Sequence, residues 1–299
     1  MKISIITATY NSEATLKSCM ISVLHQSYQN IEYVIIDGNS TDETLELVKQ
    51  HQLQFPQIEF KILSEPDKGI YDALSKGVQL ATGEVIGFVH SDDILADNQI
   101  VSTLANLFQK QDIDGVYGDL QYVDKNNIDK IIRYWKSTDF NSNLLKNGWM
   151  PAHPTLFLKK EVYEKHGEFN LSYEISADYD FMLRILKDDS LKFTYLPNVI
   201  TKMRLGGASN RSVQNIIQKT KEDYRAVRSN NIGGWYLIFL KNISKVRQFI
   251  IKSYYICHSI QNQQKKQEKN PKEVLQNKKD LPSKKRWKYF MKKYWMICS

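Results

Sequence analysis

The sequence predicts an α/β protein with a Rossmann-like, mostly parallel central sheet, helices on its faces and a basic helical extension at the C-terminus. Short apolar runs alternate with amphipathic segments through the first half of the chain, which is typical of parallel strands covered by helices. The 299 residues are 42% hydrophobic and 11% aromatic, a composition that can bury one large core with a smaller appendage.

The first half of the chain reads as strands and helices in turn. After the first apolar run comes an amphipathic helix that offers Leu16 and Leu24 to the core. Asp42 caps the second helix, and Gly83 ends the third. In order, the expected elements are strand 3–8, helix 13–25, strand 31–36, helix 43–50, strand 60–64, helix 70–81, a strand ending at residue 92 and helix 97–109.

The alternation weakens in the second half. Pro151 and Pro154 impose an extended loop, because a proline restricts both itself and the residue before it. Gly206 and Gly207 open another loop, before a long polar helix that begins near Val213. The expected elements are strands 115–119, 120–123, 130–135 and 155–158, helix 177–186, and strands 192–196 and 199–204.

Two adjacent carboxylates, Asp92 and Asp93, follow the apolar run at 85–89. Open α/β sheets bind ligands at the carboxyl ends of their strands. Neighbouring anions repel each other unless a cation joins them, and a hard divalent metal completed by substrate phosphates is one solution. The alternative is a solvated turn in which Asp92 caps the backbone at 94–95.

Charge separates the body of the chain from its tail. Residues 241–299 carry 16 Lys/Arg and 3 Asp/Glu, whereas residues 1–240 carry 25 and 30. A general nucleic-acid enzyme spreads basic residues around its binding surface, so no nucleic-acid partner is expected. The tail interleaves aromatic and basic residues, as at 284–295, and predicts an anchor on an anionic membrane surface. A solvated disordered tail is the alternative, favoured by the Gln- and Lys-rich stretch 261–279.

The cysteines and the apolar runs indicate the compartment. Cys19, Cys257 and Cys298 are far apart and show no metal or disulfide spacing, which fits a reducing environment. The N-terminal run reads as a strand and not as a signal peptide, and no apolar stretch reaches the ~18 residues of a spanning helix. We expect a cytoplasmic protein that is peripheral on the inner face of the cell membrane.

Five short motifs, taken together and in order, resemble the signature of the family 2 inverting glycosyltransferases. The resemblance covers about residues 1–210 and implies a GT-A fold, a nucleotide-sugar donor, and a Mn²⁺ or Mg²⁺ ion on the donor diphosphate. The motifs are Ile5-Ile6-Thr7-Ala8-Thr9-Tyr10-Asn11, Ile36-Asp37-Gly38-Asn39-Ser40-Thr41-Asp42, Asp67-Lys68-Gly69-Ile70-Tyr71-Asp72-Ala73, Ser91-Asp92-Asp93 and Ser176-Ala177-Asp178-Tyr179-Asp180.

The resemblance assigns the nucleotide to the loops after the first two strands. Tyr10 would pack beside the base, while Thr7 and Thr9 would hydrogen-bond the nucleotide. An ordinary core position for Tyr10 stays open. Asp37 would accept a hydrogen bond from the base or the ribose, although the family's frequent second aspartate is Gly38 in this sequence.

The diphosphate would lie near the third and fourth motifs. Lys68 would approach the phosphate or the base, and Asp67 would cap the helix that follows, with a plain solvated turn as the alternative. Asp93 would bind the metal directly, and Asp92 would contact the ribose or a metal-bound water. The metal would stabilise the departing nucleoside diphosphate.

Inversion at the sugar carbon requires a carboxylate that takes the acceptor's proton on the face opposite the leaving group. Asp178 matches the second residue of the family's Glu-Asp motif and is the expected general base, while the preceding glutamate is replaced by Ala177. Asp180 and Glu174 are the alternatives, although Asp180 points roughly 200° away from Asp178 on a helix.

Three further residues resemble family positions around the site. His153, held between two prolines, resembles the acceptor-side loop histidine, and a structural role is its alternative. Arg204 and Ser209 look like the flexible lid that would neutralise the diphosphate, and a surface salt bridge is the alternative for Arg204. His90 is expected to support the site without binding the metal.

These expectations define a catalytic domain at 1–230, with a donor half at 1–120 and an acceptor half at 121–230, and a basic amphipathic, partly disordered extension at 231–299. The expected reaction moves a sugar from a nucleotide diphosphate to a glycan or lipid-linked saccharide, in cell-surface polysaccharide or lipopolysaccharide synthesis. Uridine is favoured because the family usually uses it. The alternatives are a non-catalytic nucleotide-binding scaffold at the membrane and a nucleotidyltransferase, although residues 7–11 are not a Gly-rich phosphate loop.

Overall fold

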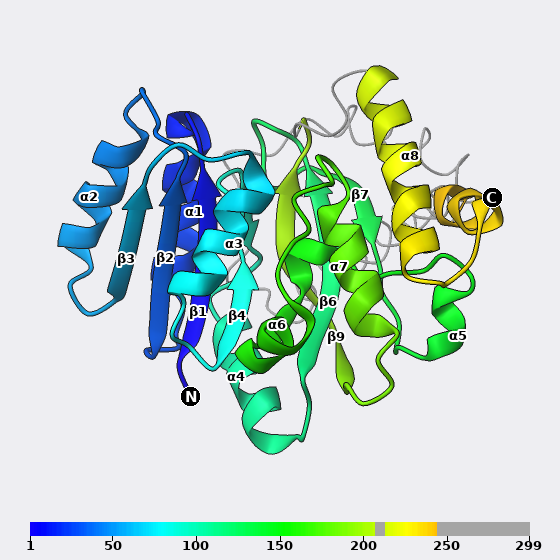
Figure 1. Ribbon diagram of the computed structural model, residues 1–299. Helices are drawn as coiled ribbons and strands as arrows, with labels where there is room; N and C mark the ends of the chain where they lie inside the picture. Colours follow the sequence, from blue (N-terminus) through cyan, green and yellow to red (C-terminus); the bar gives the residue numbers. More distant parts are fainter. Residues whose placement is uncertain (207–212, 244–299) are drawn as a thin grey trace, which may run out of the picture. The chain divides into compact units, whose positions relative to one another are not determined.

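The computed structural model describes residues 1–206 and 213–243 (Figure 1). The chain divides into two units, Met1–Lys252 and Ser253–Ser299, and the second lies outside the described residues. Within the described part, nine strands form one mixed sheet in the order β3-β2-β1-β4-β8-β6-β9-β5, with β7 paired to β6. Helices cover both faces of this sheet, so the α/β class predicted from the sequence is confirmed. None of the described helices is long and apolar enough to cross a bilayer.

The first half of the chain forms the regular, parallel part of the sheet. Strand β1 pairs in parallel with β2 and with β4, and β2 pairs in parallel with β3. The element bounds lie within a few residues of the expected ranges. They are β1 Ile3–Thr9, α1 Glu13–Leu24, β2 Ile31–Asp37, α2 Thr44–Gln54, β3 Glu59–Ser64, α3 Ile70–Leu80, β4 Val85–Phe88 and α4 Ile100–Lys110.

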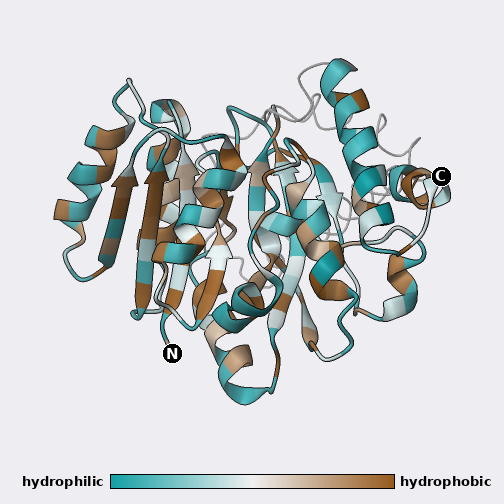
Figure 2. Ribbon diagram, viewed as in Figure 1, coloured by the Kyte–Doolittle hydropathy of each residue, from teal (hydrophilic) through white to brown (hydrophobic). Residues whose placement is uncertain are grey.

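Alternating side chains on β1 supply two separate cores, one on each face of the sheet. Ile3 and Ile5 pack with α1 and α4, whereas Ile6 and Ala8 pack with α3, as the two-residue period of a strand requires. Figure 2 shows hydrophobic residues concentrated along β2 and β3 and mostly hydrophilic residues along α8 (Val213–Ser229). Burial on both faces explains why the first strands read as continuous apolar runs.

The second half is mixed rather than parallel. Strand β8 runs antiparallel to both β4 and β6, while β6 and β9 are parallel. Antiparallel neighbours need no crossover helix, which explains why the regular alternation fades in the sequence. The elements are β5 Asp93–Leu95, β6 Gly115–Val123, β7 Ile131–Trp135, α5 Ser142–Leu145, a 3-10 turn at His153–Thr155, β8 Phe157–Lys159, α6 Lys160–His166, α7 Ala177–Leu186 and β9 Phe193–Arg204.

Several boundaries predicted for this half are wrong. The strands expected at 115–119 and 120–123 are one strand, β6, and those at 192–196 and 199–204 join into β9. Pro197 lies inside β9 where the pairing with β6 shifts register, and strands accept a proline at such an irregularity. Helices α5 and α6 have four and seven residues, which is too short to show a helical period in the sequence.

Two further corrections affect the site. The strand expected at 155–158 begins at Phe157, because His153–Thr155 form a 3-10 turn. Strand β4 ends at Phe88, and Asp93 opens the short strand β5, which pairs with β9. The acidic pair therefore lies where a turn passes into β5, and not at the end of a single long strand.

The compact domain continues beyond the boundary expected at residue 230. A helical segment at 235–243 buries Leu237 and Ile238 in the core. Its Lys241 pairs with Asp223 of α8 at 2.9 Å. The basic tail from residue 244 onward lies outside the described residues.

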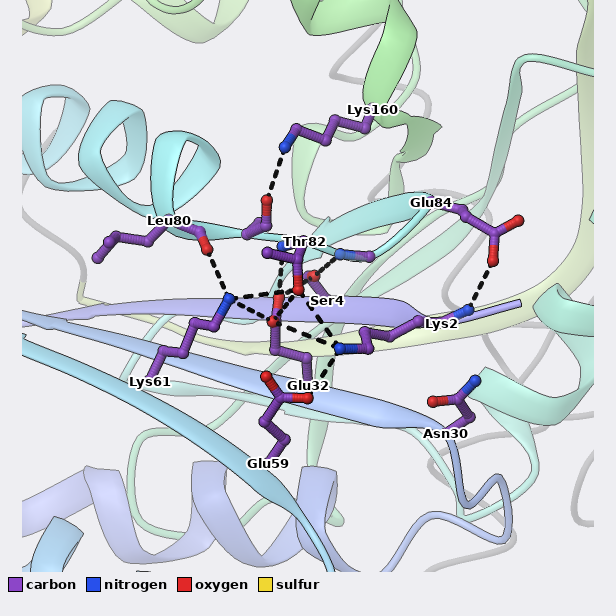
Figure 3. Close-up of polar contacts among 12 residues, drawn as sticks. Lys2, Ser4, Asn30, Glu32, Glu59, Lys61, Leu80, Thr82, Glu84 and Lys160 are labelled. Carbon is purple, nitrogen blue, oxygen red and sulfur yellow. Dashed lines mark hydrogen bonds and ion pairs between the residues drawn. The ribbon is translucent and has the colours of Figure 1, made fainter.

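Glu32 is a buried carboxylate at the amino ends of the strands, and Figure 3 shows the polar groups that surround it. Its side chain is fully buried and accepts hydrogen bonds from Ser4 and from the backbone and hydroxyl of Thr82. Lys61 lies 2.8 Å from one carboxylate oxygen. Burial acts to raise the pKa of Glu32, but the bonds from Lys61, Ser4 and Thr82 outweigh it and lower this pKa to about 2. The cluster ties β1, β2 and β3 to the start of β4.

We expect Glu32 to make the stability of the domain sensitive to acid. Because the folded pKa lies below the ordinary value, the unfolded chain binds the proton more tightly, and stability falls as the pH drops from about 4.5 towards 2. The loss is on the order of 3 kcal/mol. Urea unfolding of the wild type and Glu32→Gln between pH 7 and pH 3 measures it. The variant should be less stable at pH 7 and should lose less on acidification, and parallel curves for the two proteins would contradict the assignment.

Candidate active site

The carboxyl ends of the parallel strands meet at one edge of the sheet. Thr9 ends β1 and pairs in register with Asp37, which ends β2, and Asp37 pairs with Ser64 at the end of β3. The loops that carry Tyr10 and Asp67 follow directly. This edge is where open α/β sheets bind ligands, and the structure brings most of the predicted donor-side residues together there.

Asp37 is held rigidly at this edge. It is fully buried, and it accepts hydrogen bonds from the backbone N–H of Ser40 at 3.0 Å, the Ser40 hydroxyl at 2.5 Å and the Ser64 hydroxyl at 2.7 Å. A carboxylate has about four acceptor positions, so three are used by the protein. Asp37 therefore fixes the loop at 38–40 and has one acceptor position left for a ligand.

Gly38 allows two predicted site residues to approach each other. A Cβ atom at this position would lie 2.6 Å from Asp67 Oδ2 and 3.4 Å from Tyr10 Cδ2. Asp67 thus occupies the volume next to residue 38, and its other oxygen accepts the N–H of Gly69 at 2.8 Å. Gly38 stands where the family frequently has a second aspartate, and the carboxylate of Asp67 lies next to this position.

The exposed aromatic and basic groups of this edge are Tyr10 and Lys68. The Tyr10 side chain is 64% exposed, so it is a surface platform and not the core residue that the sequence left open. Lys68 is also exposed, and its backbone N–H donates to Asp72 at 3.0 Å. Both side chains are available to a ligand at the carboxyl edge.

Thr7 and Thr9 differ in what they can offer. Thr7 is fully buried, and its hydroxyl donates to the carbonyl oxygen of Val89 at 2.6 Å. Thr9 is 4% exposed, and its hydroxyl has no hydrogen-bond partner among the described residues. A buried hydroxyl without a partner is costly, so Thr9 has the group that a ligand would satisfy, whereas Thr7 holds the end of β4.

Asp93 is a buried carboxylate whose pKa is shifted strongly by its surroundings. It is fully buried, and neither carboxylate oxygen has a hydrogen-bond partner among the described residues. Burial first, and then the charge of Asp92, raise the pKa of Asp93 well above its ordinary value, against the opposing effect of Arg204. A buried carboxylate in this state is compensated only by a proton or a cation.

The donor set fits a divalent metal that is held mainly by substrate. Within residues 1–206 and 213–243, no three His, Cys, Asp or Glu side chains converge as a metal cage. Asp93 nevertheless offers two free oxygen ligands, and Mg²⁺-like ions are commonly held by one or two carboxylates together with substrate phosphates. The orphaned oxygens of Asp93 therefore fit the predicted Mn²⁺ or Mg²⁺.

Arg204 is placed beside the acidic pair by strand pairing. Asp93 on β5 pairs with Met203 on β9, so the last residue of β9 lies against the turn that carries the acidic pair. The Arg204 guanidinium donates to the Asp92 carbonyl oxygen at 2.7 Å and to the Ser18 hydroxyl at 2.9 Å, and the side chain is 8% exposed. Arg204 is thus a fixed, buried cation, and the alternative interpretation of this residue as part of a surface salt bridge is wrong. Ser209 lies outside the described residues.

Asp178 lies in the first turn of α7, where the sequence places it. One of its oxygens, Oδ1, accepts a hydrogen bond from the hydroxyl of Tyr71, on α3, at 3.0 Å. Asp180 is engaged elsewhere, because it accepts bonds from Arg184 at 3.1 Å and Asn230 at 2.9 Å. The alternative base is therefore used in the packing of α7. Asp178 keeps an oxygen, Oδ2, that receives no hydrogen bond from the described part of the chain.

Two histidines lie between the acidic pair and Asp178. The rings of His90 and His153 are 6.2 Å apart. Burial lowers the pKa of His153 to about 4, and it also lowers that of His90, although the charge of Asp178 acts to raise both. Both rings are therefore neutral near pH 7. His153 Nε2 and His90 Nδ1 lack partners among the described residues, so each ring presents a polar nitrogen to this region.

Sequence reasoning missed Tyr71 as a functional residue. It belongs to the third motif, but its position on an amphipathic helix suggests core packing. Its ring does pack near that of Phe169, with the two ring centroids 5.6 Å apart. The contact with Asp178 spans 107 residues. Only the fold brings the two together, and no local signal in the sequence reports it.

Known proteins match both the sequence and the fold. The family described as Glycosyl transferase family 2 matches residues 4–167. A PGL/p-HBAD biosynthesis glycosyltransferase of Mycobacterium bovis is 31% identical over 214 residues, covering 70% of this chain and 80% of that protein. The Escherichia coli enzyme named UDP-Glc:alpha-D-GlcNAc-diphosphoundecaprenol beta-1,3-glucosyltransferase WfgD is 30% identical over 209 residues, covering 69% and 78%.

Two solved structures share the fold at low sequence identity. S. aureus TarS 1-349 in complex with UDP-GlcNAc has a TM-score of 0.60 and 19% identity, covering 77% of this chain and 65% of that one. This chain spans 40% of the TarS chain in a longer structure of that protein. The mannosyltransferase PcManGT from Pyrobaculum calidifontis, in complex with GDP-Man and Mn²⁺, has a TM-score of 0.58 and 16% identity, covering 80% and 68%. Together with the family match and the identity to curated enzymes, they confirm the predicted fold and enzyme class: the chain belongs to glycosyltransferase family 2 and is a glycosyltransferase with the GT-A fold.

Proposed function

We propose that the protein is a metal-dependent, inverting glycosyltransferase that moves a sugar from a UDP-sugar to a hydroxyl of a lipid-linked saccharide or glycan. The observation that carries the proposal is Asp93, a fully buried carboxylate with two unpartnered oxygens at the carboxyl edge of the sheet. A carboxylate in that position is stabilised by a divalent cation that also binds the diphosphate of the donor.

The donor nucleotide lies over the carboxyl ends of β1 and β2 in this proposal. Tyr10 provides an exposed ring for the base, the Thr9 hydroxyl donates to the nucleotide, and Asp37 accepts from the base or ribose with its remaining lone pair. Asp67 and Lys68 flank the same region. Uridine is supported by TarS, solved with UDP-GlcNAc, and by WfgD, whose name specifies UDP-Glc. The PcManGT complex with GDP-Man makes guanosine the competitor to test.

Mn²⁺ or Mg²⁺ fits the acidic turn. Asp93 would hold the ion directly, and Asp92 would orient a metal-bound water or the ribose. When bound, such an ion supplies Lewis-acid stabilisation of the departing diphosphate. Arg204 adds a fixed positive charge against the same turn. The Mn²⁺ in the PcManGT complex supports this choice of cofactor.

Asp178 acts as the general base in this scheme. Its carboxylate takes the proton of the acceptor hydroxyl while the acceptor oxygen attacks the sugar carbon from the side opposite the diphosphate. The neutral rings of His90 and His153 can orient the acceptor hydroxyl without competing for the proton near pH 7. This division explains why two carboxylates serve the leaving group and a third, on another element, serves the acceptor.

The acceptor and the membrane are linked in the proposal. WfgD is named for a diphosphoundecaprenol acceptor, which supports a lipid-linked saccharide here. Trp235, Tyr236 and Phe239 are 56%, 54% and 66% exposed on the helical segment at 235–243. Exposed aromatic residues followed by a strongly basic sequence favour binding to an anionic lipid surface. They support a peripheral location on the inner face of the cell membrane.

We expect the roles of Asp93 and Asp178 to separate in two variants. Mn²⁺ with UDP should raise the Tm of the wild type and of Asp178→Asn, because both retain the donor site. The same ligands should leave the Tm of Asp93→Ala unchanged. UDP release from a panel of UDP-sugars should fall roughly 10²-fold or more in both variants, because one lacks the metal ligand and the other the base. Wild-type turnover by both variants would contradict the proposal, and UDP binding without turnover by the wild type would favour a binding protein.

The metal-free protein should carry an electrostatic cost at Asp93. Asp93→Asn removes a buried charge and its repulsion with Asp92, which together outweigh the attraction of Arg204. We therefore expect the Tm in EDTA to rise by roughly 2–4 °C, corresponding to about 1 kcal/mol. Asp189→Asn is the control, because it removes one charge from an exposed position. Equal or lower stability of Asp93→Asn relative to that control would argue against an uncompensated carboxylate.

A chain ending at Lys252 should separate the tail from catalysis. It keeps the compact unit Met1–Lys252 and removes most of the basic tail. We expect loss of co-sedimentation with phosphatidylserine vesicles and unchanged UDP release from a UDP-sugar. Phosphatidylcholine vesicles are the control for charge dependence. Binding of the shortened chain equal to that of the full chain would contradict the role of the tail.

A further inference from the structure

The hydroxyl of Tyr71 has two acceptors within hydrogen-bond distance and only one proton. It lies 2.6 Å from the carbonyl oxygen of Ile175 and 3.0 Å from Asp178 Oδ1. A phenol donates one hydrogen bond and accepts others through its oxygen. When its proton points to Ile175, the tyrosine oxygen is free to accept a hydrogen from the carboxyl group of Asp178.

The Ile175 acceptor is fixed by a second helix. Glu222 of α8 is 4% exposed, and its carboxylate accepts the backbone N–H groups of Glu174 at 3.1 Å, Ile175 at 2.8 Å and Ser176 at 2.9 Å. Asp223, the next residue, accepts the Ser176 hydroxyl at 2.8 Å. The segment before α7 is therefore anchored from one side, and its carbonyl points to Tyr71 on the other.

Tyr71 keeps its proton over the working pH range. Burial first, and then the charge of Asp178, raise the pKa of Tyr71 well above its ordinary value, and Glu222 contributes in the same direction. In the described part of the chain, the charge of Asp178 also affects His90, His153 and Tyr122. The pKa values of both histidines are lowered and that of Tyr122 is raised, so these three groups stay neutral near pH 7.

We propose that Tyr71 is a positioning residue that keeps a hydrogen bond to Asp178 in both protonation states of the general base. Before transfer, Tyr71 donates to the Asp178 carboxylate. After transfer, Tyr71 donates to the Ile175 carbonyl and accepts from the Asp178 carboxylic acid. The proposal rests on the general-base function proposed for Asp178, and it goes further by naming the group that supports the base.

The proton balance of the step is closed. The acceptor oxygen forms a bond to the sugar carbon, and the bond from that carbon to the diphosphate oxygen breaks with its electron pair leaving on the diphosphate. The acceptor's proton goes to Asp178 and later to solvent, with no change in oxidation state. Because Tyr71 bonds Oδ1 and the acceptor's proton arrives on Oδ2, the Asp178 carboxyl group turns about its Cβ–Cγ bond and Tyr71 rotates its O–H bond before the acid donates to the tyrosine oxygen.

Tyr71→Phe tests the proposal through the pH profile of turnover. Tyr71→Phe removes a charge-assisted hydrogen bond, which favours the carboxylate form of Asp178 more than the weaker neutral bond favours the acid form. The acidic limb of UDP release from a UDP-sugar, with water as acceptor, should then move to higher pH by roughly one unit, or tenfold in rate on that limb. The affinity for UDP with Mn²⁺ should stay within about twofold, because the Tyr71 hydroxyl bonds Ile175 and Asp178 on the acceptor side. Tyr28→Phe is the matched control, since its hydroxyl also donates to a backbone carbonyl, that of Met1, at 2.6 Å.

Parallel measurement of Asp178→Asn distinguishes the possible failures. If Asp178→Asn loses turnover and Tyr71→Phe keeps the wild-type acidic limb, the role of Tyr71 is overturned and the base assignment stands. If Asp178→Asn keeps turnover, both are overturned. An equal shift of the limb in Tyr28→Phe would show that loss of any buried tyrosine bond is sufficient, which also overturns the specific role. Glu222→Gln provides a second variant, for which we expect slower turnover with an unshifted acidic limb.

Discussion

A carboxylate buried without a hydrogen bond is the constraint around which this domain is arranged. Asp93 has no exposed surface, no partner among the described residues for either oxygen, and a second carboxylate as its sequence neighbour. Burial of an ionised group costs several kcal/mol unless another charge compensates it. The fold tolerates this position because β5 pairs with β9 and packs against α1. A cation that binds together with the donor would remove the electrostatic cost.

The pairing of β5 with β9 connects that carboxylate to the rest of the site. It places Arg204 against the backbone of Asp92, although the two residues are 112 positions apart. The chain then continues through residues outside the described part to α8, where Glu222 anchors the segment before α7. Two connections therefore join the donor side to the acceptor side. The chain itself runs from β9 to α8, and the Tyr71 hydroxyl of α3 bonds Asp178 of α7.

The first half of the fold could be predicted from the sequence because its strands are buried on both faces and its helices are amphipathic. These patterns are local and strong, and they placed Asp37 correctly at the end of β2. In the second half, the helical pattern at 177–186 placed Asp178 correctly in the first turn of α7. The second half resisted prediction because antiparallel pairing and the short helices α5 and α6 leave no long period. Pro197 inside β9 shows the same limit, since its tolerance depends on a register shift against another strand.

The site divides in the same way. The motifs singled out Tyr10, Asp93 and Asp178 as candidates, because each lies at a fixed place beside a strand or a helix start. They did not separate Thr7 from Thr9, because which hydroxyl is satisfied depends on Val89, the residue that follows β4. The roles of Tyr71 and Glu222 could not be predicted from the sequence for a related reason. The contact of Tyr71 with Asp178 spans 107 residues, and the contacts of Glu222 with the segment before α7 span up to 48 residues.

Direct measurement of Mn²⁺ binding tests the central claim, that Asp93 is the metal ligand of a donor site. The free Mn²⁺ signal in electron paramagnetic resonance reports how much metal the protein removes from solution. The account predicts that the wild type with UDP binds one Mn²⁺ ion per chain, that omission of UDP weakens binding strongly, and that Asp93→Asn with UDP binds little. Equal Mn²⁺ binding by the wild type and Asp93→Asn in the presence of UDP would contradict it.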